Sequence, residues 1–296
     1  MKIVYVAKHG NGGNDEEGAI KHALEELGHN VQLFHETEGN LISRQRGDLC
    51  LFHKWYDTRW LRNLPFPKIF WYFDLVNYPD PLLEHRNKSR IQWMQAVTPL
   101  VDLGFCTDGD WVLQDPHGKL IWLPQAFDGR YIGKTKLKDE RSQILFMGIK
   151  NGGGDARKKW VSLMSARYGS RFCHVERGVH GEQLKNMIGT AQIVVAPDSP
   201  VTDNYWSNRV YLTLGNGGFL LHPFAKNLVK HYAGNVDLVY YNNMEQLDNL
   251  ISNYLQSRLL RDHISDAGLE RTRKQHLYLH RCEEMLGVVK ERLGVY

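Results

Sequence analysis

The sequence has no hydrophobic run that approaches the roughly 20 apolar residues of a membrane-spanning helix. The apolar part of the N-terminus, MKIVYVAKHG, is too short and too early for a secretory signal and predicts a first β-strand instead. We therefore expect a cytoplasmic protein without a membrane span.

Cysteine is scarce, with four residues in a chain of 296, and no two of them form a C-x-x-C pair. Cys50, Cys106 and Cys173 lie in apolar, strand-like runs, and Cys282 lies in a predicted helix. This usage predicts reduced thiols in the protein core.

A strong excess of one charge is missing too, since the formal net charge is only +4. Such a balance permits an anionic ligand or a nucleic acid partner and requires neither. Hydrophobic residues make up 42% of the chain and charged residues 24%, which is typical of a globular protein. No internal repeat of solenoid period is present.

Short apolar runs alternate with segments of helical periodicity along the chain. In the first half the predicted strands are 3–7, 31–34, 49–52, 69–73, 103–106 and 121–123. In the second half they are 144–147, 172–175, 193–196, 219–221 and 236–240, followed by a largely helical region over 244–293. Alternation of this kind predicts an α/β fold with doubly wound, Rossmann-like parallel sheets.

The polar, basic segment DGRYIGKTKLKDERS at 128–142 interrupts this pattern and predicts a connection between two domains. We expect one domain over 1–132, a linker over 133–142 and a second domain over 143–275. The helix over 276–296 is expected to pack back on the first domain. Ligands of open α/β sheets bind beyond the carboxyl ends of the strands, so two such domains are expected to face each other across a ligand-binding cleft.

Two glycine-rich segments follow predicted strands. HGNGGND, residues 9–15, precedes a helix, and Gly12 and Gly13 would let backbone amides approach an anion. The segment matches neither the phosphate-loop pattern nor the spaced Rossmann fingerprint, and a plain strand-to-helix turn explains it equally well.

The second glycine-rich segment, GIKNGGGDARKK at 148–159, places Arg157 and Lys159 at the start of a helix. Cations there oppose the helix dipole, and a bound anion such as a diphosphate would offset that cost. A solvated basic turn is the alternative.

A third segment, SNRVYLTLGNGGFLLHP at 207–223, passes from a helix to a buried strand. Arg209 lies near the helix start, beside the capping residue type Asn208. Gly217 and Gly218 allow a tight turn against a ligand or a helix. A turn that needs a positive φ angle is the alternative, and both interpretations can hold together.

Asp74 ends the apolar strand FWYFD and is a candidate general base, because burial can tune the pKa of a carboxyl group at that edge. A capping role in the following turn is the alternative.

Three further patterns suggest other ligands. Asp108-Gly109-Asp110 spells the D-x-D of metal-dependent transferases, but Asp and Gly also form ordinary turns, which we favour here. His276 and His280 share a helix face without a third ligand, so no metal site is predicted there. Tyr205 and Trp206 could stack on a base or a sugar, or pack in the core.

The chain resembles group 1 glycosyltransferases of the two-domain GT-B fold, and more narrowly their spore-maturation, CgeB-like branch. The similar segments are ILFMG, SNRVYLTLGNGGFLLHP and HLYLHRCEEML in the second half, and KIFWYFD and VDLGFCTDGDWVL leading to IWLPQAFDGRY in the first. The resemblance covers most of the chain, but its motifs are loose and transfer the fold better than the substrate.

The resemblance implies a nucleotide-diphosphate sugar as co-substrate, most simply a UDP-sugar, without an obligatory metal. The second domain would hold this donor and the first domain the acceptor. The donor-binding residues it implies are Gly12, Gly13, Arg157, Lys159, Asp203, Asn204, Asn208, Arg209, Gly217 and Gly218. Leu212 departs from the family, which often has a ribose-binding glutamate three residues after this arginine. That departure favours inverting transfer, with Asp74 as base.

The acceptor is predicted from surface composition alone. HKWYDTRWLRNLPF, residues 53–66, mixes cations and aromatics, and we take His53, Trp55 and Arg59 as candidate acceptor contacts. A hydroxymethylated base in duplex DNA, flipped out of the helix, is the first hypothesis. A cell-envelope glycan or a small molecule is the alternative, and a noncatalytic nucleotide- or nucleic-acid-binding module is a second class of function.

Overall fold

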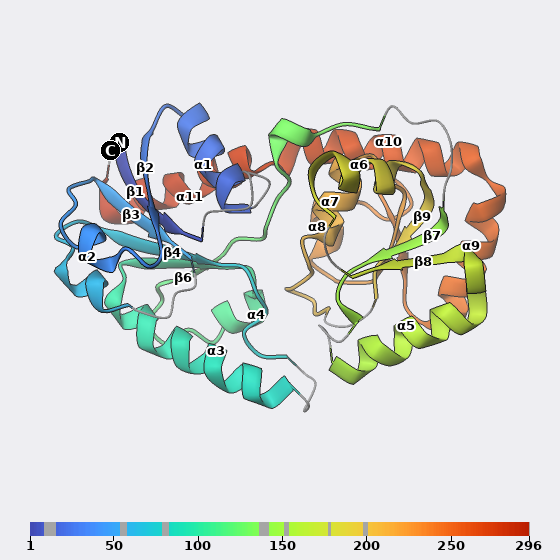
Figure 1. Cartoon of the computed structure of the whole chain (residues 1–296), viewed down its shortest axis with the longest axis horizontal. Coiled ribbons are helices and arrows are strands. Elements are labelled where there is room, and N and C mark those ends of the chain that lie inside the picture. The colour runs from blue at the N-terminus through green and yellow to red at the C-terminus, as the bar shows by residue number, and fades with distance from the viewer. Residues whose placement is uncertain are drawn as a thin grey trace. The chain divides into compact units, whose positions relative to one another are not determined.

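A computed structural model describes residues 1–8, 16–53, 58–78, 83–135, 142–150, 154–176, 179–197 and 201–295. Its contacts divide the chain into two compact units (Figure 1). The first unit contains 1–78, 84–128 and 278–296, and the second contains 79–83 and 129–277. Within the described ranges, no helix is long and apolar enough to cross a membrane. The division into independently folding domains with a linker over 133–142 remains our proposal.

The first unit is built on a parallel sheet with strand order β2-β1-β3-β4-β5-β6. The strands are β1 (Lys2–Ala7), β2 (Asn30–His35), β3 (Leu49–Phe52), β4 (Lys68–Tyr72), β5 (Leu103–Cys106) and β6 (Leu120–Trp122). The helices are α1 (Glu16–Glu26), α2 (Gly39–Ile42), η1 (Arg59–Asn63), α3 (Glu84–Val97), η3 (Thr98–Leu100), α4 (Gly109–Val112) and α11 (Tyr278–Leu293).

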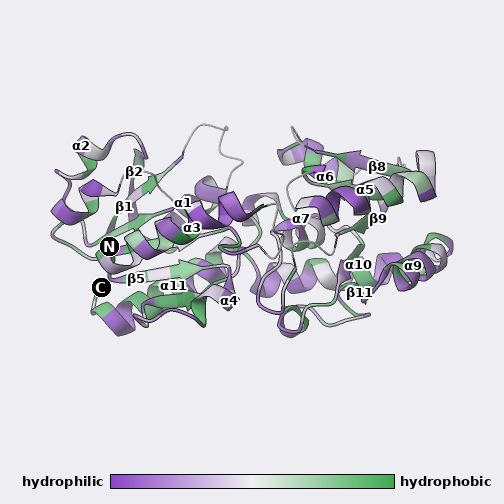
Figure 2. Ribbon diagram, turned by 90° about the horizontal axis from the view of Figure 1, so that it is seen from below, coloured by the Kyte–Doolittle hydropathy of each residue, from purple (hydrophilic) through white to green (hydrophobic). Residues whose placement is uncertain are grey.

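Alternation of side chains along these strands gives the sheet two apolar faces. Tyr5 and Trp71 belong to the face covered by α1 and α11, whereas Phe52 and Phe70 belong to the face covered by η1 and α3. The colouring in Figure 2 shows hydrophobic strands between helices of mixed hydropathy. Burial on both faces explains why the strands appear in the sequence as continuous apolar runs.

The second unit is built on a parallel sheet with strand order β11-β10-β9-β7-β8. The strands are β7 (Ser142–Met147), β8 (Phe172–Val175), β9 (Ala191–Val195), β10 (Leu220–Pro223) and β11 (Val239–Tyr241). The helices are η4 (Gly129–Tyr131), α5 (Gly154–Tyr168), η6 (Gly169–Arg171), α6 (Gly181–Gly189), α7 (Arg209–Gly215), α8 (Leu228–His231), α9 (Met244–Gln256) and α10 (Arg258–Gln275).

Helix α5 lies on one face of the second sheet, and α6 and α7 lie on the other (Figure 1). Trp160 and Met164 of α5 pack with Phe146 and Val195 of the strands in one apolar cluster. The predicted strands of both halves are confirmed except for the last, predicted at 236–240, which begins only at Val239; the predicted α/β fold with two parallel sheets is correct. The predicted helical region over 244–293 is divided into three helices, with breaks at Ser257 and at 276–277.

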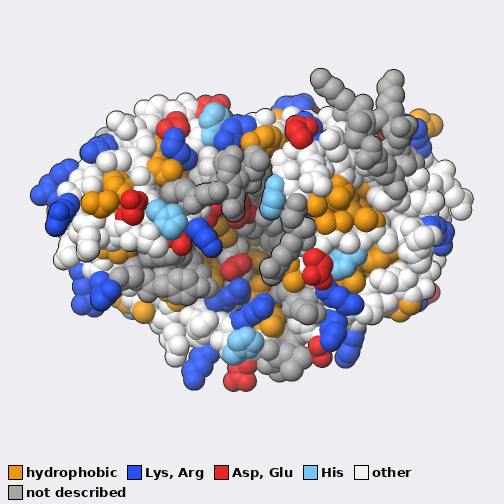
Figure 3. Space-filling view, viewed as in Figure 1, with side chains coloured by type: hydrophobic (Ala, Val, Ile, Leu, Met, Phe, Trp, Pro, Cys, Tyr) orange, Lys and Arg blue, Asp and Glu red, His pale blue; other side chains and the backbone are white. Residues whose placement is uncertain are grey.

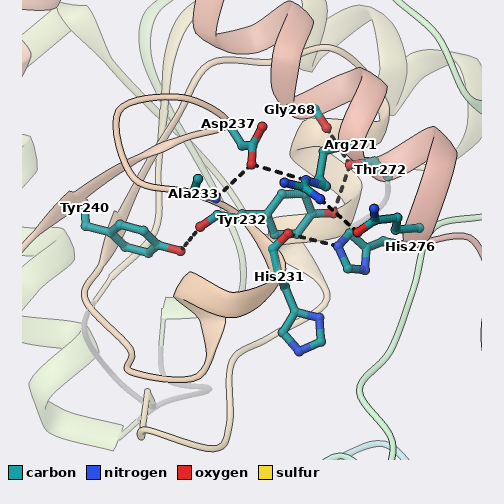
Figure 4. Close-up of polar contacts among 10 residues, drawn as sticks. His231, Tyr232, Ala233, Asp237, Tyr240, Gly268, Arg271, Thr272 and His276 are labelled. Atoms are coloured by element: carbon teal, nitrogen blue, oxygen red, sulfur yellow. Dashed lines mark hydrogen bonds and ion pairs between the residues drawn. The ribbon is translucent and has the colours of Figure 1, made fainter.

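A polar network ties the end of α10 to the segment before β11 (Figure 4). The buried Thr272 hydroxyl donates to the Gly268 carbonyl at 2.8 Å and lies 2.9 Å from the Tyr232 hydroxyl. His276 Nε2 donates to the His231 carbonyl at 3.1 Å. The His276 ring is buried, and this hydrogen bond gives it a structural role at the end of α10.

Candidate functional site

The order of the second sheet creates a switch point between β7 and β9, since the chain first moves outward to β8 and then returns to the other side of β7. Ligands of open α/β sheets bind at such a point, beyond the carboxyl ends of the strands. The connections that leave β7 and β9 there lead to α5 and α7, whose described starts are Gly154 and Arg209. The sheet topology therefore directs attention to Arg209.

Arg209 reaches back from the start of α7 to the end of β7. Its Nε donates to the Met147 carbonyl at 2.6 Å, and its Nη1 donates to the Ser207 hydroxyl at 3.0 Å. The guanidinium carbon lies over the Phe146 ring, 5.0 Å from the ring centroid. We call Phe146, the Met147 carbonyl and Gly148 the Arg209 seat.

Gly148 completes the Arg209 seat by having no side chain. Its φ angle is +151°, and a Cβ atom there would lie 2.5 Å from Arg209 Nη2 and 3.1 Å from the Phe146 ring. Both the backbone conformation and the missing space favour glycine at this position. The guanidinium therefore occupies the volume that any other residue would fill.

Among the described residues, Arg209 forms no ion pair with a carboxylate, because its polar contacts are the neutral oxygens of Met147 and Ser207. Burial and the nearby charge of Arg157 lower the pKa of Arg209 to about 9. A cation–π contact is worth up to about 2 kcal/mol when desolvated, which offsets only part of the penalty for burying a charge. A bound anion would supply the missing countercharge.

The structure places Arg157 near Arg209. Some of the other predicted donor-binding residues lie elsewhere or are exposed. Arg157 is buried on the first turns of α5 and donates to the Ile149 carbonyl at 3.3 Å, whereas Lys159 is exposed. Asn208 directly precedes Arg209. Asp203 is exposed and accepts from the Lys226 amide at 3.2 Å, and Asn204 accepts from the Asn227 side chain.

Gly217 and Gly218 lie between the end of α7 and the start of β10, at the amino edge of the sheet and thus opposite to Arg209. Their amides donate to the Leu214 and Thr213 carbonyls, each at 2.9 Å. Gly217 has a φ angle of +71°, and a Cβ at either glycine would clash with neighbouring side chains. The predicted contact of these glycines with the donor is therefore corrected: they form the tight helix-to-strand turn that was the alternative.

On the first unit, His53 is a buried residue at the end of β3. Its Nδ1 donates to the Trp71 carbonyl at 2.9 Å, so its Nε2 accepts from the Tyr5 hydroxyl at 2.5 Å. With both ring nitrogens used in the core, His53 is corrected from an acceptor contact to a structural residue. Arg59 is exposed on η1, and Gly12, Gly13 and Trp55 lie outside the described residues.

Asp74 is exposed just beyond β4, at the carboxyl edge where the sequence places it. Its carboxylate pairs with Arg90 Nη2 at 3.2 Å. Arg90 also donates to the Leu75 carbonyl at 2.8 Å and lies over the Tyr78 ring. Arg90 thus fixes Asp74 and its loop.

Asp108 is confirmed as a turn residue. One carboxylate oxygen accepts from the Trp111 amide at 3.1 Å, as the N-cap of α4, and the other accepts from the Val76 amide at 2.8 Å. Burial raises the pKa of Asp108. In the described part of the chain, no three His, Cys, Asp or Glu side chains gather into a group that could hold a metal ion.

Sequence reasoning missed three residues around Arg209: Phe146, Gly148 and His222. Phe146 looked like an ordinary core residue, and Gly148 was one of several glycines in its loop. Only the switch-point rule, applied to the end of β7, could have selected Gly148.

Tyr205 and Trp206 were proposed either to stack on a ligand or to pack in the core. Both are buried, and Trp206 donates to the Tyr211 hydroxyl at 3.0 Å.

His222 on β10 is fully enclosed, and its Nδ1 donates to the Pro223 carbonyl at 2.7 Å. Burial, with a smaller contribution from the charge of Arg209, lowers the pKa of His222 from 6.5 to about 4. As the pH falls from about 6.5 to 4, the unfolded chain binds a proton that the native protein excludes, so stability falls over this window.

We expect this histidine to contribute a loss of about 3 kcal/mol in unfolding free energy across that window. Urea unfolding of the wild type and of His222→Asn, which keeps a donor near the Nδ1 position, at pH 7.5 and 4.5 measures it. The variant should lose less stability on acidification. An equal loss in both proteins would show that His222 is not buried as a neutral ring.

Comparison with known proteins gives a family match over part of the chain. Residues 152–287 match the family model described as "Glycosyl transferase-like". A search of curated proteins gives no significant match.

Solved structures resemble the whole chain. Sucrose-phosphate synthase from Thermosynechococcus elongatus superposes with a TM-score of 0.73 at 12% identity, over 100% of both chains. HepE from Anabaena, solved in complex with UDP-glucose, has a TM-score of 0.66 at 10% identity and covers 98% of this chain and 100% of its own. A glycosyltransferase from Rickettsia africae has a TM-score of 0.64 at 12% identity, over 99% and 98%.

At these identities the structural likeness establishes the fold, which is the predicted GT-B class. The family match supports the expected glycosyltransferase at the level of the domain and does not address the CgeB-like branch. Residues 152–287 therefore match a glycosyltransferase-like family model, in a chain that has the GT-B fold.

Proposed function

We propose that the protein transfers a sugar from a nucleotide-diphosphate sugar to an acceptor hydroxyl. The observation that carries this proposal is the partly buried Arg209, which lies at the switch point of the second sheet without a carboxylate partner among the described residues. Arg157 and the start of α5 add positive potential there. A diphosphate meets both requirements, because it is anionic and accepts hydrogen bonds from guanidinium groups.

In the proposed reaction the acceptor oxygen attacks the anomeric carbon as the bond from that carbon to the diphosphate oxygen breaks. The electron pair leaves with the diphosphate, whose growing negative charge Arg209 and Arg157 stabilise. The acceptor proton passes to a base, and we propose Asp74 for this step, with inversion at the anomeric carbon. Arg90 would hold its carboxylate in place.

HepE was solved with UDP-glucose and with UDP, which makes UDP the first probe of the donor site here. The other donor contacts that we propose are Asn208, Asp203 and Asn204, while Lys159 would meet the diphosphate only through a change of side-chain conformation, since it is exposed.

The candidate acceptors are a glycan, a small molecule and hydroxymethylated DNA. The charge pattern of the surface argues against DNA. Basic side chains on α10, which could have offered a DNA surface, are largely paired with acids: Arg258 with Asp262, Arg271 with Asp237, and Arg273 and Lys274 with Glu270. On the face shown in Figure 3, basic and acidic side chains are interspersed. This pattern favours a glycan or small-molecule acceptor over hydroxymethylated DNA, and both belong in the acceptor panel.

Replacing Arg209 by Met keeps an unbranched side chain and removes the guanidinium. We expect the affinity for UDP to fall by about 30-fold or more, because truncating a buried charged partner removes about 2 kcal/mol or more. Without nucleotide the variant should be at least as stable as the wild type, since burial and Arg157 both oppose the charge.

Calorimetric titration with UDP, GDP, dTDP and ADP, together with urea unfolding, checks both expectations. Arg273→Met, on the exposed side of α10, is the matched control. Undiminished nucleotide affinity in Arg209→Met would refute the donor site. Nucleotide binding without release of glucose from UDP-glucose, or of sugar from the other donors, would instead favour the noncatalytic module.

Gly148→Ala tests the space around the guanidinium. The added Cβ would displace Arg209, so we expect a loss of UDP affinity similar to that of Arg209→Met. Gly169→Ala is the control, because Gly169 also has a positive φ angle, +53°, but has no atom near its missing Cβ. Both variants should lose stability, by up to about 2 kcal/mol, and only Gly148→Ala should lose affinity. Equal affinities would show that Gly148 is a turn residue alone.

Asp74→Asn tests the base. We expect turnover to fall by about 100-fold or more, with the Kd for UDP unchanged, since general-base catalysis contributes that much to a rate. Steady-state transfer to the acceptor found in the panel, compared with UDP titration, separates the two quantities. Turnover within threefold of the wild type would exclude Asp74 as the base.

A further inference from the structure

His174 on β8 stacks on the ring that carries the Arg209 guanidinium. Phe146 and His174 are register partners on adjacent strands, so their side chains point to the same face of the sheet. Their ring centroids are 5.1 Å apart and the ring planes differ by only 13°. Trp160 of α5 contacts the same Phe146 ring edge to face, at 5.2 Å.

The imidazole of His174 also holds the second part of the Arg209 seat. Its Nε2 lies 2.8 Å from the Gly148 carbonyl, and because a carbonyl only accepts, Nε2 must carry the proton and donate. The Gly148 amide in turn donates to the Val175 carbonyl at 2.8 Å. Gly148 is therefore fixed from β8 on both its backbone groups.

One side chain thus contacts both Phe146 and Gly148, the two residues that shape the space of the guanidinium. This matters because no carboxylate in the described part of the chain defines the direction of Arg209, and Arg157 repels it. The contacts that the structure shows for the guanidinium are neutral ones, and they hold it at the carboxyl edge of the sheet. Supporting residues of this kind commonly tune a binding site by fixing the groups that touch the ligand.

We propose that His174 is a positioning residue for Arg209: through the Phe146 ring and the Gly148 carbonyl it holds the guanidinium in the orientation that binds diphosphate. The inference rests on the proposed function of the site. It predicts that substitutions of His174 weaken diphosphate binding although His174 itself makes no contact with the ligand.

Three substitutions separate its two contacts. His174→Gln keeps an N–H donor for the Gly148 carbonyl and loses the ring, whereas His174→Phe keeps a ring for Phe146 and loses the donor. His174→Ala loses both. We expect the Kd values for UDP and for inorganic pyrophosphate to rise about tenfold in the Ala variant, as for a lost supporting group, and less in the Gln and Phe variants.

The decisive measurement is a double-mutant cycle with Arg209→Met. If His174 acts through Arg209, His174→Ala changes the Kd for UDP by less than twofold in the Arg209→Met background. His263→Ala, an exposed histidine on α10, is the control and should leave the Kd unchanged. Thermal unfolding of each variant identifies any that fail to fold. If His174→Ala does not fold, the double-mutant cycle is measured with His174→Gln and His174→Phe instead.

Three outcomes are distinguishable. Additive effects of His174 and Arg209 substitutions, or unchanged affinity in all three His174 variants, would overturn the positioning role while leaving the donor site intact. Unchanged affinity in Arg209→Met would overturn the proposed function first. A tenfold loss that disappears in the Arg209→Met background supports the inference.

Discussion

The site depends on one electrostatic situation: the Arg209 guanidinium is partly buried in the second unit, and its partners among the described residues are neutral groups. Arg209 rests on the Phe146 ring and the Met147 carbonyl, in a space that exists because Gly148 has no side chain. Folding gains little from such a charge, since its desolvation and the repulsion from Arg157 oppose the contacts that hold it. In the proposed function, an anion would compensate a charge that is unfavourable in the empty protein, which is the usual relation between stability and binding at a functional site.

Sheet topology explains why this charge lies where it does. In the second unit the chain moves outward from β7 to β8 and then returns to β9 on the other side of β7, so the connections that follow β7 and β9 begin side by side at the carboxyl edge. The seat comes from the end of β7, and the arginine arrives from the segment after β9. Met147 and Arg209, about sixty residues apart in the sequence, meet because β7 and β9 are adjacent parallel strands.

The sequence predicts the strands well because parallel strands buried on both faces form continuous apolar runs, as in LCLF and LGFC. It also identifies Arg209, since a cation beside capping residue types near a helix start is unusual. It fails at Gly217, because a glycine that serves a turn and one that serves a ligand look alike until the edge of the sheet is known. It fails at His53 for a related reason: the Tyr5 and Trp71 partners that satisfy its ring lie on other strands.

The two units differ in how they treat charge at their carboxyl edges. In the first, Asp74 has its cation, Arg90, and Asp108 is satisfied by backbone amides, so the described acids there are already compensated. In the second, the described partners of Arg209 leave its charge uncompensated. An anionic ligand group therefore gains most at the second unit, and a neutral hydroxyl compound is better suited to the first. This division of charge, rather than any single motif, is the physical reason why we propose the diphosphate for the second unit and the acceptor for the first.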